Sequence, residues 1–167
     1  GKAMLFDGTN FHQHVNAGTY NPSVASGQLT VALWVKWDGL SDVYQGLISK
    51  RDTWDRYDMM WQFEAAQTNG MVGFKRDGEG EAQAATPTVG VWTHIAATFD
   101  GKVLTVYVDG EQTGQDTNWS FGYDTESAIQ IGACDPGGGN AFNGAIDDVW
   151  IYDRALSQDE IKALAGK

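Results

Sequence analysis

The sequence predicts an all-β fold, an antiparallel β-sandwich of the jelly-roll type with one short C-terminal helix. Three observations support this fold class. Short segments alternate apolar and polar residues with a period of two, Asp-Gly turns separate several of them, and only the last segment carries the start signals of a helix. The chain of 167 residues contains no linker and no break in composition. We therefore expect residues 1–167 to form a single domain.

The first clear strand covers residues 29–37, with the sequence LTVALWVKW. Its apolar face consists of Leu29, Val31, Leu33, Val35 and Trp37. Residues 57–64 alternate in the same way and send Met59, Trp61 and Phe63 to one face. We expect Trp37, Trp61 and Trp92 in the core, and Trp34 and Trp150 on the opposite faces of their strands. There Trp150 either covers the terminal helix or meets another domain.

A β-meander is predicted between residues 92 and 114. Two apolar segments are joined at Asp100-Gly101, and a second turn follows at Asp109-Gly110. Asp-Gly tolerates the positive φ that tight hairpin turns require, so these pairs are strong hairpin signals. Later strands are expected at residues 128–133 and 145–152.

The terminal helix has a complete start signal. Ser157 is a natural N-cap and Glu160 completes a capping box, while Leu156 and Ile161 are spaced for a hydrophobic staple. Two helical turns are not stable alone in water, because helix nucleation is costly. We therefore expect Ile161 and Leu164 to dock on the sandwich, with the helix as a lid at one end of the core and without a functional role.

Charge and composition exclude several classes of partner. The net charge is −11, and the 11 basic residues never cluster beyond pairs, so nucleic acid is not an expected partner. No apolar run approaches the ~20 residues of a membrane-spanning helix, so we expect no membrane insertion. The first residues lack a signal-peptide core, so any export signal was removed or lay upstream. Cys134 is the single cysteine, which excludes a disulfide framework within the chain.

Five segments, in this order, resemble the LamG-like jelly-roll domains of the concanavalin A-like lectin/glucanase superfamily. They are LFDGTNFHQHV, LTVALWVKW, GLISKRD, VWTHIAATFDGKVLTVYVDGE and FNGAIDDVWIYDRALSQDEI. The resemblance implies two curved antiparallel sheets and a non-catalytic module of a larger secreted or cell-surface protein. Such modules commonly bind carbohydrate, so a glycan or polysaccharide is the expected partner, and many members hold a structural calcium ion.

Two adjacent carboxylates, Asp147 and Asp148, occupy the last predicted strand. Neighbours on a strand point to opposite faces, so we expect only one of them at any one site. Asp147 shares its parity with apolar residues that should face the core, where a carboxylate is costly unless it is paired or bound to metal. The resemblance offers Asp7 as a partner, which gives a predicted calcium site of Asp7 and Asp147. Alternatively, both acids cap turns or accept backbone N–H groups.

The predicted ligand surface consists of two loops, residues 50–58 and 118–124, that combine aromatic and planar polar side chains. The predicted ligand-binding residues are Trp54, Arg56, Tyr57, Asp58, Trp119 and Tyr123. Exposed aromatic rings flanked by charges are typical of recognition surfaces. Alternatively, these aromatic side chains fasten their loops to the core.

Catalysis on the same fold is a competing hypothesis, because a polysaccharide hydrolase needs two carboxylates roughly 5–10 Å apart. The available pairs are Asp58 with Glu64, and Glu79 with Glu81, and neither is convincing. A lyase base is not evident, so we expect no enzymatic activity. His12 and His14 have the spacing of two zinc ligands but lack evident third and fourth ligands. A module that packs against a neighbouring domain or protein, without binding sugar, is the remaining alternative.

Overall fold

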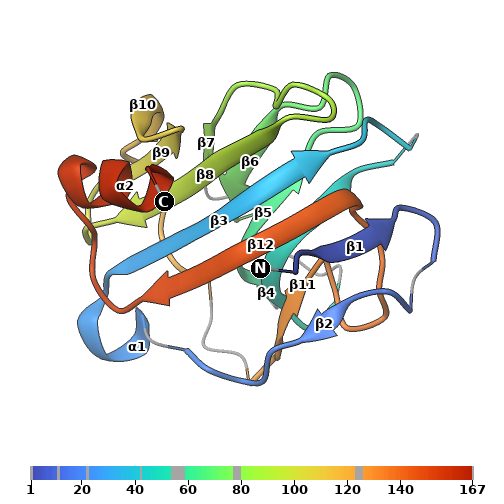
Figure 1. The fold of residues 1–167 in the computed structure, drawn as a ribbon. Helices are drawn as coiled ribbons and strands as arrows, with labels where there is room; N and C mark the ends of the chain where they lie inside the picture. Colours follow the sequence, from blue (N-terminus) through green and yellow to red (C-terminus); the bar gives the residue numbers. More distant parts are fainter. Residues whose placement is uncertain are drawn as a thin grey trace.

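The computed structural model describes residues 2–10, 12–21, 23–41, 43–53, 59–76, 80–122 and 126–166. These residues form a sandwich of two antiparallel sheets, as predicted (Figure 1). The first sheet has the strand order β1-β12-β3-β8-β9-β10, and the second has the order β2-β11-β4-β5-β6-β7. No helix in the described ranges is long and apolar enough to cross a membrane.

The strands of the first sheet are β1 (Met4–Asp7), β3 (Leu29–Trp37), β8 (Trp92–Phe99), β9 (Leu104–Val108), β10 (Glu111–Asp116) and β12 (Asn143–Tyr152). The strands of the second sheet are β2 (Val15–Asn16), β4 (Gln45–Arg51), β5 (Met59–Ala65), β6 (Val72–Lys75), β7 (Glu81–Gln83) and β11 (Ile129–Ile131). The first and last strands of the chain pair with one another, from Met4 opposite Ile146 to Asp7 opposite Asn143.

The main core lies between the two sheets and is rich in aromatic rings. Trp37 and Trp61 are buried in it, as the sequence predicts. Trp61 stacks on Phe74 with ring centroids 5.7 Å apart, and Phe74 meets Phe63 edge to face at 4.8 Å. Such pairs add stabilisation beyond the burial of their surface.

Trp92 does not lie in the core, contrary to the prediction, and 40% of its surface is exposed. Along β8 the core residues are Ile95, Ala97 and Phe99, so the even-numbered positions of this strand face outward. Trp92 pairs with Lys36 of β3 on that outer face. The sequence-based assignment counted Trp92 among the apolar-face residues of its strand, but the core residues of β8 have the opposite parity.

Two helices are present in the described ranges, α1 (Ser23–Ser26) and α2 (Gln158–Ala165). The capping box of α2 is confirmed: the Glu160 N–H donates to Ser157 Oγ at 3.3 Å, and the Ser157 N–H donates to Glu160 Oε2 at 2.9 Å. Ile161 and Leu164 are buried, as predicted.

The position of α2 differs from the prediction. The helix does not close one end of the main core but packs on the outer face of the first sheet (Figure 1). There its apolar residues form a second, smaller cluster with strand residues, composed of Ala32, Ala96, Tyr107, Leu156, Ile161 and Leu164. Because the two alanines are small, the helix can approach the sheet closely at this point. The outer face of the first sheet is therefore divided into a covered part and an open part.

Candidate functional site

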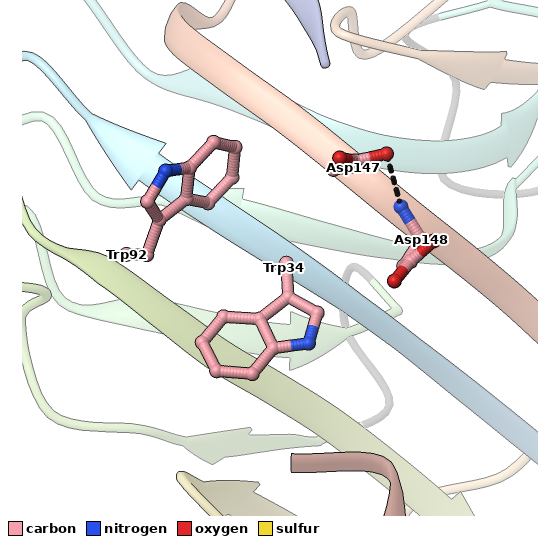
Figure 2. A pocket seen from close by; sticks show the side chains of 4 residues that line it. All are labelled: Trp34, Trp92, Asp147 and Asp148. Atoms are coloured by element: carbon pink, nitrogen blue, oxygen red, sulfur yellow. Dashed lines mark hydrogen bonds between the residues drawn. The ribbon is translucent and has the colours of Figure 1, made fainter. Parts of the chain in front are cut away.

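The open part of the outer face contains a cleft of about 310 Å³ lined by Trp34, Trp92, Asp147 and Asp148. These residues come from three adjacent strands, β3, β8 and β12. Figure 2 shows the two indole rings on one side of the cleft and the two aspartates, both from β12, on the other. We refer to this site as the tryptophan cleft.

A β-bulge in β12 brings both carboxylates to the cleft. Asp147 lies opposite Trp34, but the next pair along the ladder is Trp150 opposite Ala32, so one extra residue is inserted in β12. Asp148 occupies the bulge with a φ of 45°, in the left-handed region that aspartate tolerates better than most residues. The prediction that the two acids point to opposite faces is therefore wrong, because it assumed an unbroken period of two.

The bulge also reverses the predicted parity of the residues that precede it in β12. Val149 and Ile151 pack against the main core, and Asp147 faces outward instead of sharing their face. Asp147 is half-buried and Asp148 is exposed. The Asp148 N–H donates to Asp147 Oδ1 at 2.9 Å, which holds one oxygen of that carboxylate. The other oxygen of Asp147 and the Asp148 carboxylate remain as hydrogen-bond acceptors on the cleft side.

The indole of Trp34 contacts the ring of His94, its partner on the neighbouring strand β8. The two rings meet edge to face, with centroids 5.5 Å apart and an interplanar angle of 66°. His94 is 1% exposed, and its Nδ1 has no hydrogen-bond partner among the described residues. Burial lowers the pKa of His94 to about 4, and the opposing effect of the nearby Asp109 carboxylate is smaller. The imidazole is therefore neutral at physiological pH and acts as an uncharged support for the tryptophan.

Trp150 lies next to the tryptophan cleft on the same outer face and is 41% exposed. Its ring stacks on that of Tyr152, with centroids 6.3 Å apart and an angle of 17°. Tyr152 in turn packs against the small cluster beneath α2. The sequence correctly assigned Trp34 and Trp150 to the faces opposite the core.

The predicted calcium pair is not brought together. Asp7 lies opposite Asn143, four positions along β12 from Asp147, which corresponds to about 13 Å at the rise of a β-strand. Asp7 instead caps a turn, because its Oδ1 accepts the N–H of Thr9 at 3.0 Å and of Asn10 at 2.8 Å. These bonds lower the pKa of Asp7. The described residues contain no group of three His, Cys, Asp or Glu side chains that could hold a metal ion.

The predicted ligand loops are described only in part. Trp54, Arg56, Tyr57, Asp58 and Tyr123 lie outside the described residues. Trp119 is described, and its prediction as a ligand-binding residue is wrong, because only 3% of its surface is exposed.

The ring of Trp119 is surrounded by those of Phe74, Phe99 and Phe121, with centroid distances of 5.6, 4.7 and 5.1 Å. It therefore fastens its loop to the core and offers no face to a ligand, which is the alternative that the sequence left open.

The predicted acid pairs provide no catalytic arrangement among the described residues. Asp58 and Glu79 lie outside those residues. Glu64 is buried, and its carboxylate forms an ion pair with Lys75 Nζ at 2.7 Å and accepts a hydrogen bond from Gln62 Nε2 at 2.7 Å. Both of its oxygens are thus engaged within the outer face of the second sheet.

Comparison with known proteins gives a consistent family and fold. A family model described as the concanavalin A-like lectin/glucanases superfamily matches residues 7–162. A search of curated proteins finds no match.

Several solved structures share the fold. The carbohydrate-binding module of the Ruminococcus gnavus IT-sialidase, solved with α2,3-sialyllactose, has a TM-score of 0.72 and 20% identity, covering 99% of this chain and 96% of that one. Domain 4 of an extracellular arabinanase from Geobacillus stearothermophilus, solved with arabinotriose, has a TM-score of 0.65 and 20% identity, covering 99% and 82%. A SAP-like pentraxin from Limulus polyphemus has a TM-score of 0.66 and 18% identity, covering 96% and 80%.

Proposed function

Since the chain belongs to the concanavalin A-like lectin/glucanases superfamily, we propose that it is a non-catalytic carbohydrate-binding module whose ligand binds in the tryptophan cleft. The observation that carries the proposal is the arrangement of two accessible indoles opposite two carboxylates in one cleft. We further propose that it serves as a module of a larger secreted or cell-surface protein, as the resemblance implies.

The chemistry of the cleft suits a sugar ring. An indole offers a broad apolar face, which packs on the C–H groups of a pyranose or furanose ring. The carboxylate oxygens of Asp147 and Asp148 accept hydrogen bonds from sugar hydroxyls, and charged acceptors form stronger bonds than neutral ones. Apolar walls with a few convergent polar groups are typical of small-ligand sites.

The charge of the cleft favours a neutral sugar. Two of its four described lining residues are acidic and none is basic. Lys36 pairs with Trp92 on the same face but is not one of the lining residues. A sialic acid or a uronate carboxylate would be repelled by Asp147 and Asp148, since juxtaposed like charges cost binding energy. The Ruminococcus module was solved with sialyllactose, but it is only 20% identical to this chain, and we do not expect this cleft to bind that ligand.

The same arrangement argues against hydrolysis. A glycosidase places its two carboxylates on either side of the scissile bond. Asp147 and Asp148 are adjacent in the chain and both lie on one side of the cleft (Figure 2). One of their oxygens is also engaged by a backbone N–H. The pair is therefore suited to accept hydroxyl hydrogen bonds and not to flank a bond.

Affinity electrophoresis tests this proposal. Gels containing arabinan, galactan, mannan or mixed-linkage β-glucan, and gels containing polygalacturonate, are run with the wild type, Trp34→Ala and Trp92→Ala. Tyr20→Ala serves as the matched control, because Tyr20 is 58% exposed but does not line the cleft. We expect retardation by at least one neutral polymer that both tryptophan variants lose and the control keeps. Retardation by none of them, together with binding to a neighbouring domain, would instead favour the interaction module.

A further inference from the structure

We infer that the ligand surface extends beyond the tryptophan cleft as a diagonal track of three tryptophans, Trp92, Trp34 and Trp150, which binds several consecutive units of a polysaccharide chain. This inference rests on the proposed function and specifies its ligand as an internal chain segment and not a single terminal sugar.

The register of three strands sets the direction of the track. Trp92 of β8 pairs with Lys36 of β3, and Trp34 lies two residues further along β3. Trp34 in turn lies opposite Asp147 of β12, and Trp150 occupies the next outward position of β12, opposite Ala32. Each tryptophan is thus displaced by one strand and by two residues from the one before. At ~3.3 Å per residue and ~4.8 Å between strands, each step is about 8 Å.

The packing of α2 confines a ligand to this diagonal. Ala32 and Ala96, which continue β3 and β8 beyond the cleft, are buried beneath the helix with Leu156 and Ile161. A chain lying over Trp92 and Trp34 therefore meets the helix if it continues straight along either strand. Trp150 lies on β12, beside the covered part of the sheet, so the open continuation of the surface is over this residue.

The two ends of the track are equally accessible. Trp92 is 40% exposed and Trp150 is 41% exposed. The ring of Trp150 is held by its stack on Tyr152, which limits the side-chain entropy lost when a ligand binds. Asp147 lies opposite Trp34, on the same strand as Trp150, so its carboxylate is available to hydroxyls at the middle of the track. Solvent-exposed aromatic surface of this extent indicates recognition.

The inference is tested by isothermal titration calorimetry with di- to hexasaccharides of the arabinose, galactose, mannose and glucose polymers. For the series that binds, we expect the affinity of the wild type to rise with length. Trp150→Ala should weaken hexasaccharide binding about tenfold, the upper range for an aromatic stacking contact, while disaccharide binding is unchanged. Trp34→Ala should weaken binding at every length. Trp150→Phe should restore most of the hexasaccharide affinity, and equal Tm values exclude misfolding.

Equal affinities for disaccharide and hexasaccharide in the wild type would overturn the track and leave the tryptophan cleft as a single-sugar site. An unchanged hexasaccharide affinity in Trp150→Ala would overturn it in the same way. Failure of the proposed function has a different signature, because then no neutral polymer retards the protein and Trp34→Ala changes nothing.

Discussion

The ring of His94 meets the ring of Trp34 edge to face at 5.5 Å, so one tryptophan both lines the cleft and contacts a buried histidine. The imidazole is neutral because burial lowers its pKa to about 4. Protonation of His94 in the folded protein is therefore disfavoured above pH ~4. Acid stability and the integrity of the cleft are coupled through this pair.

We predict that stability decreases as the pH falls from about 6.5 to about 4. In this window the unfolded chain binds a proton at His94 and the folded chain does not, so the free energy of unfolding falls as the pH falls. The full effect is about 3 kcal/mol, since one pKa unit corresponds to about 1.4 kcal/mol. Urea denaturation at successive pH values measures it.

His94→Phe is the matched variant for this prediction, because it keeps a ring against Trp34 and removes the titrating group. Its stability should depend less on pH between 6.5 and 4. The Arg154 hydrogen bond lowers the pKa of Glu160 to about 2, so the stability contributed by this pair is lost only below pH ~4.5 and should remain in the variant. Identical pH profiles for the variant and the wild type above pH 4.5 would refute the role of His94.

The bulge at Asp148 gives a second prediction. Asp148 has a φ of 45°, which glycine adopts without steric cost. A β-branched residue adopts this φ only at a steric cost. Asp148→Gly should leave the free energy of unfolding unchanged or raise it by up to about 1 kcal/mol. Asp148→Val should lower it by about 1–3 kcal/mol. Chemical denaturation compares them, and equal stabilities would mean that residue 148 is not in the left-handed region.

Asp148→Asn tests the role of the Asp148 charge without changing the backbone conformation of the bulge. Asparagine also tolerates the left-handed region, so this variant should fold normally. We predict weaker retardation in a neutral polysaccharide gel and less discrimination against polygalacturonate, because one of the two cleft carboxylates is lost. Unchanged behaviour on both polymers would show that the Asp148 carboxylate does not contact the sugar.

Trp119 and Trp92 should behave in opposite ways. Trp119→Ala leaves a cavity among Phe74, Phe99 and Phe121 and should lower the free energy of unfolding by about 3–5 kcal/mol. Trp92→Ala removes a half-exposed ring, so it should lower the free energy of unfolding by less than Trp119→Ala does. It should nevertheless abolish sugar binding. A thermal melt and an affinity gel on each variant make the comparison, and equal destabilisation by the two changes would contradict it.

A structural calcium ion remains a prediction from the family resemblance. Because Asp7 lies about 13 Å along the ladder from Asp147, one ion does not bridge them. We therefore predict that Asp147→Asn leaves the dependence of Tm on calcium and on a chelator unchanged. A calcium-induced rise in Tm that is present in the wild type and absent from Asp147→Asn would contradict the assignment of this carboxylate to the cleft.

Much of the fold is predictable from the sequence because it depends on local patterns. Asp109-Gly110 forms the tight turn between β9 and β10, with φ values of 49° and 82°. Ser157 and Glu160 form the capping box at the predicted position. These features involve residues close in the chain, so their physical cause is present in the sequence itself.

The candidate site is less predictable, because it depends on two non-local features. The single extra residue at Asp148 reverses the parity of the preceding part of β12, and no sequence signal distinguished this position from a regular strand. The exposure of Trp92 depends on which face of β8 the core occupies, and an indole alone is compatible with either face. The alternation of Ile95, Ala97 and Phe99 was the signal that could have assigned it correctly.

The most direct test of sugar binding in the cleft is a titration followed by the indole N–H signals in ¹H–¹⁵N NMR spectra. The titrant is the hexasaccharide of the neutral polymer that retards the protein most strongly, and Trp34→Phe and Trp92→Phe assign the two signals. We predict that the signals of Trp34 and Trp92 shift together with one saturation curve while that of buried Trp61 does not move. Saturable shifts confined to Trp54, with Trp34 and Trp92 unchanged, would contradict it.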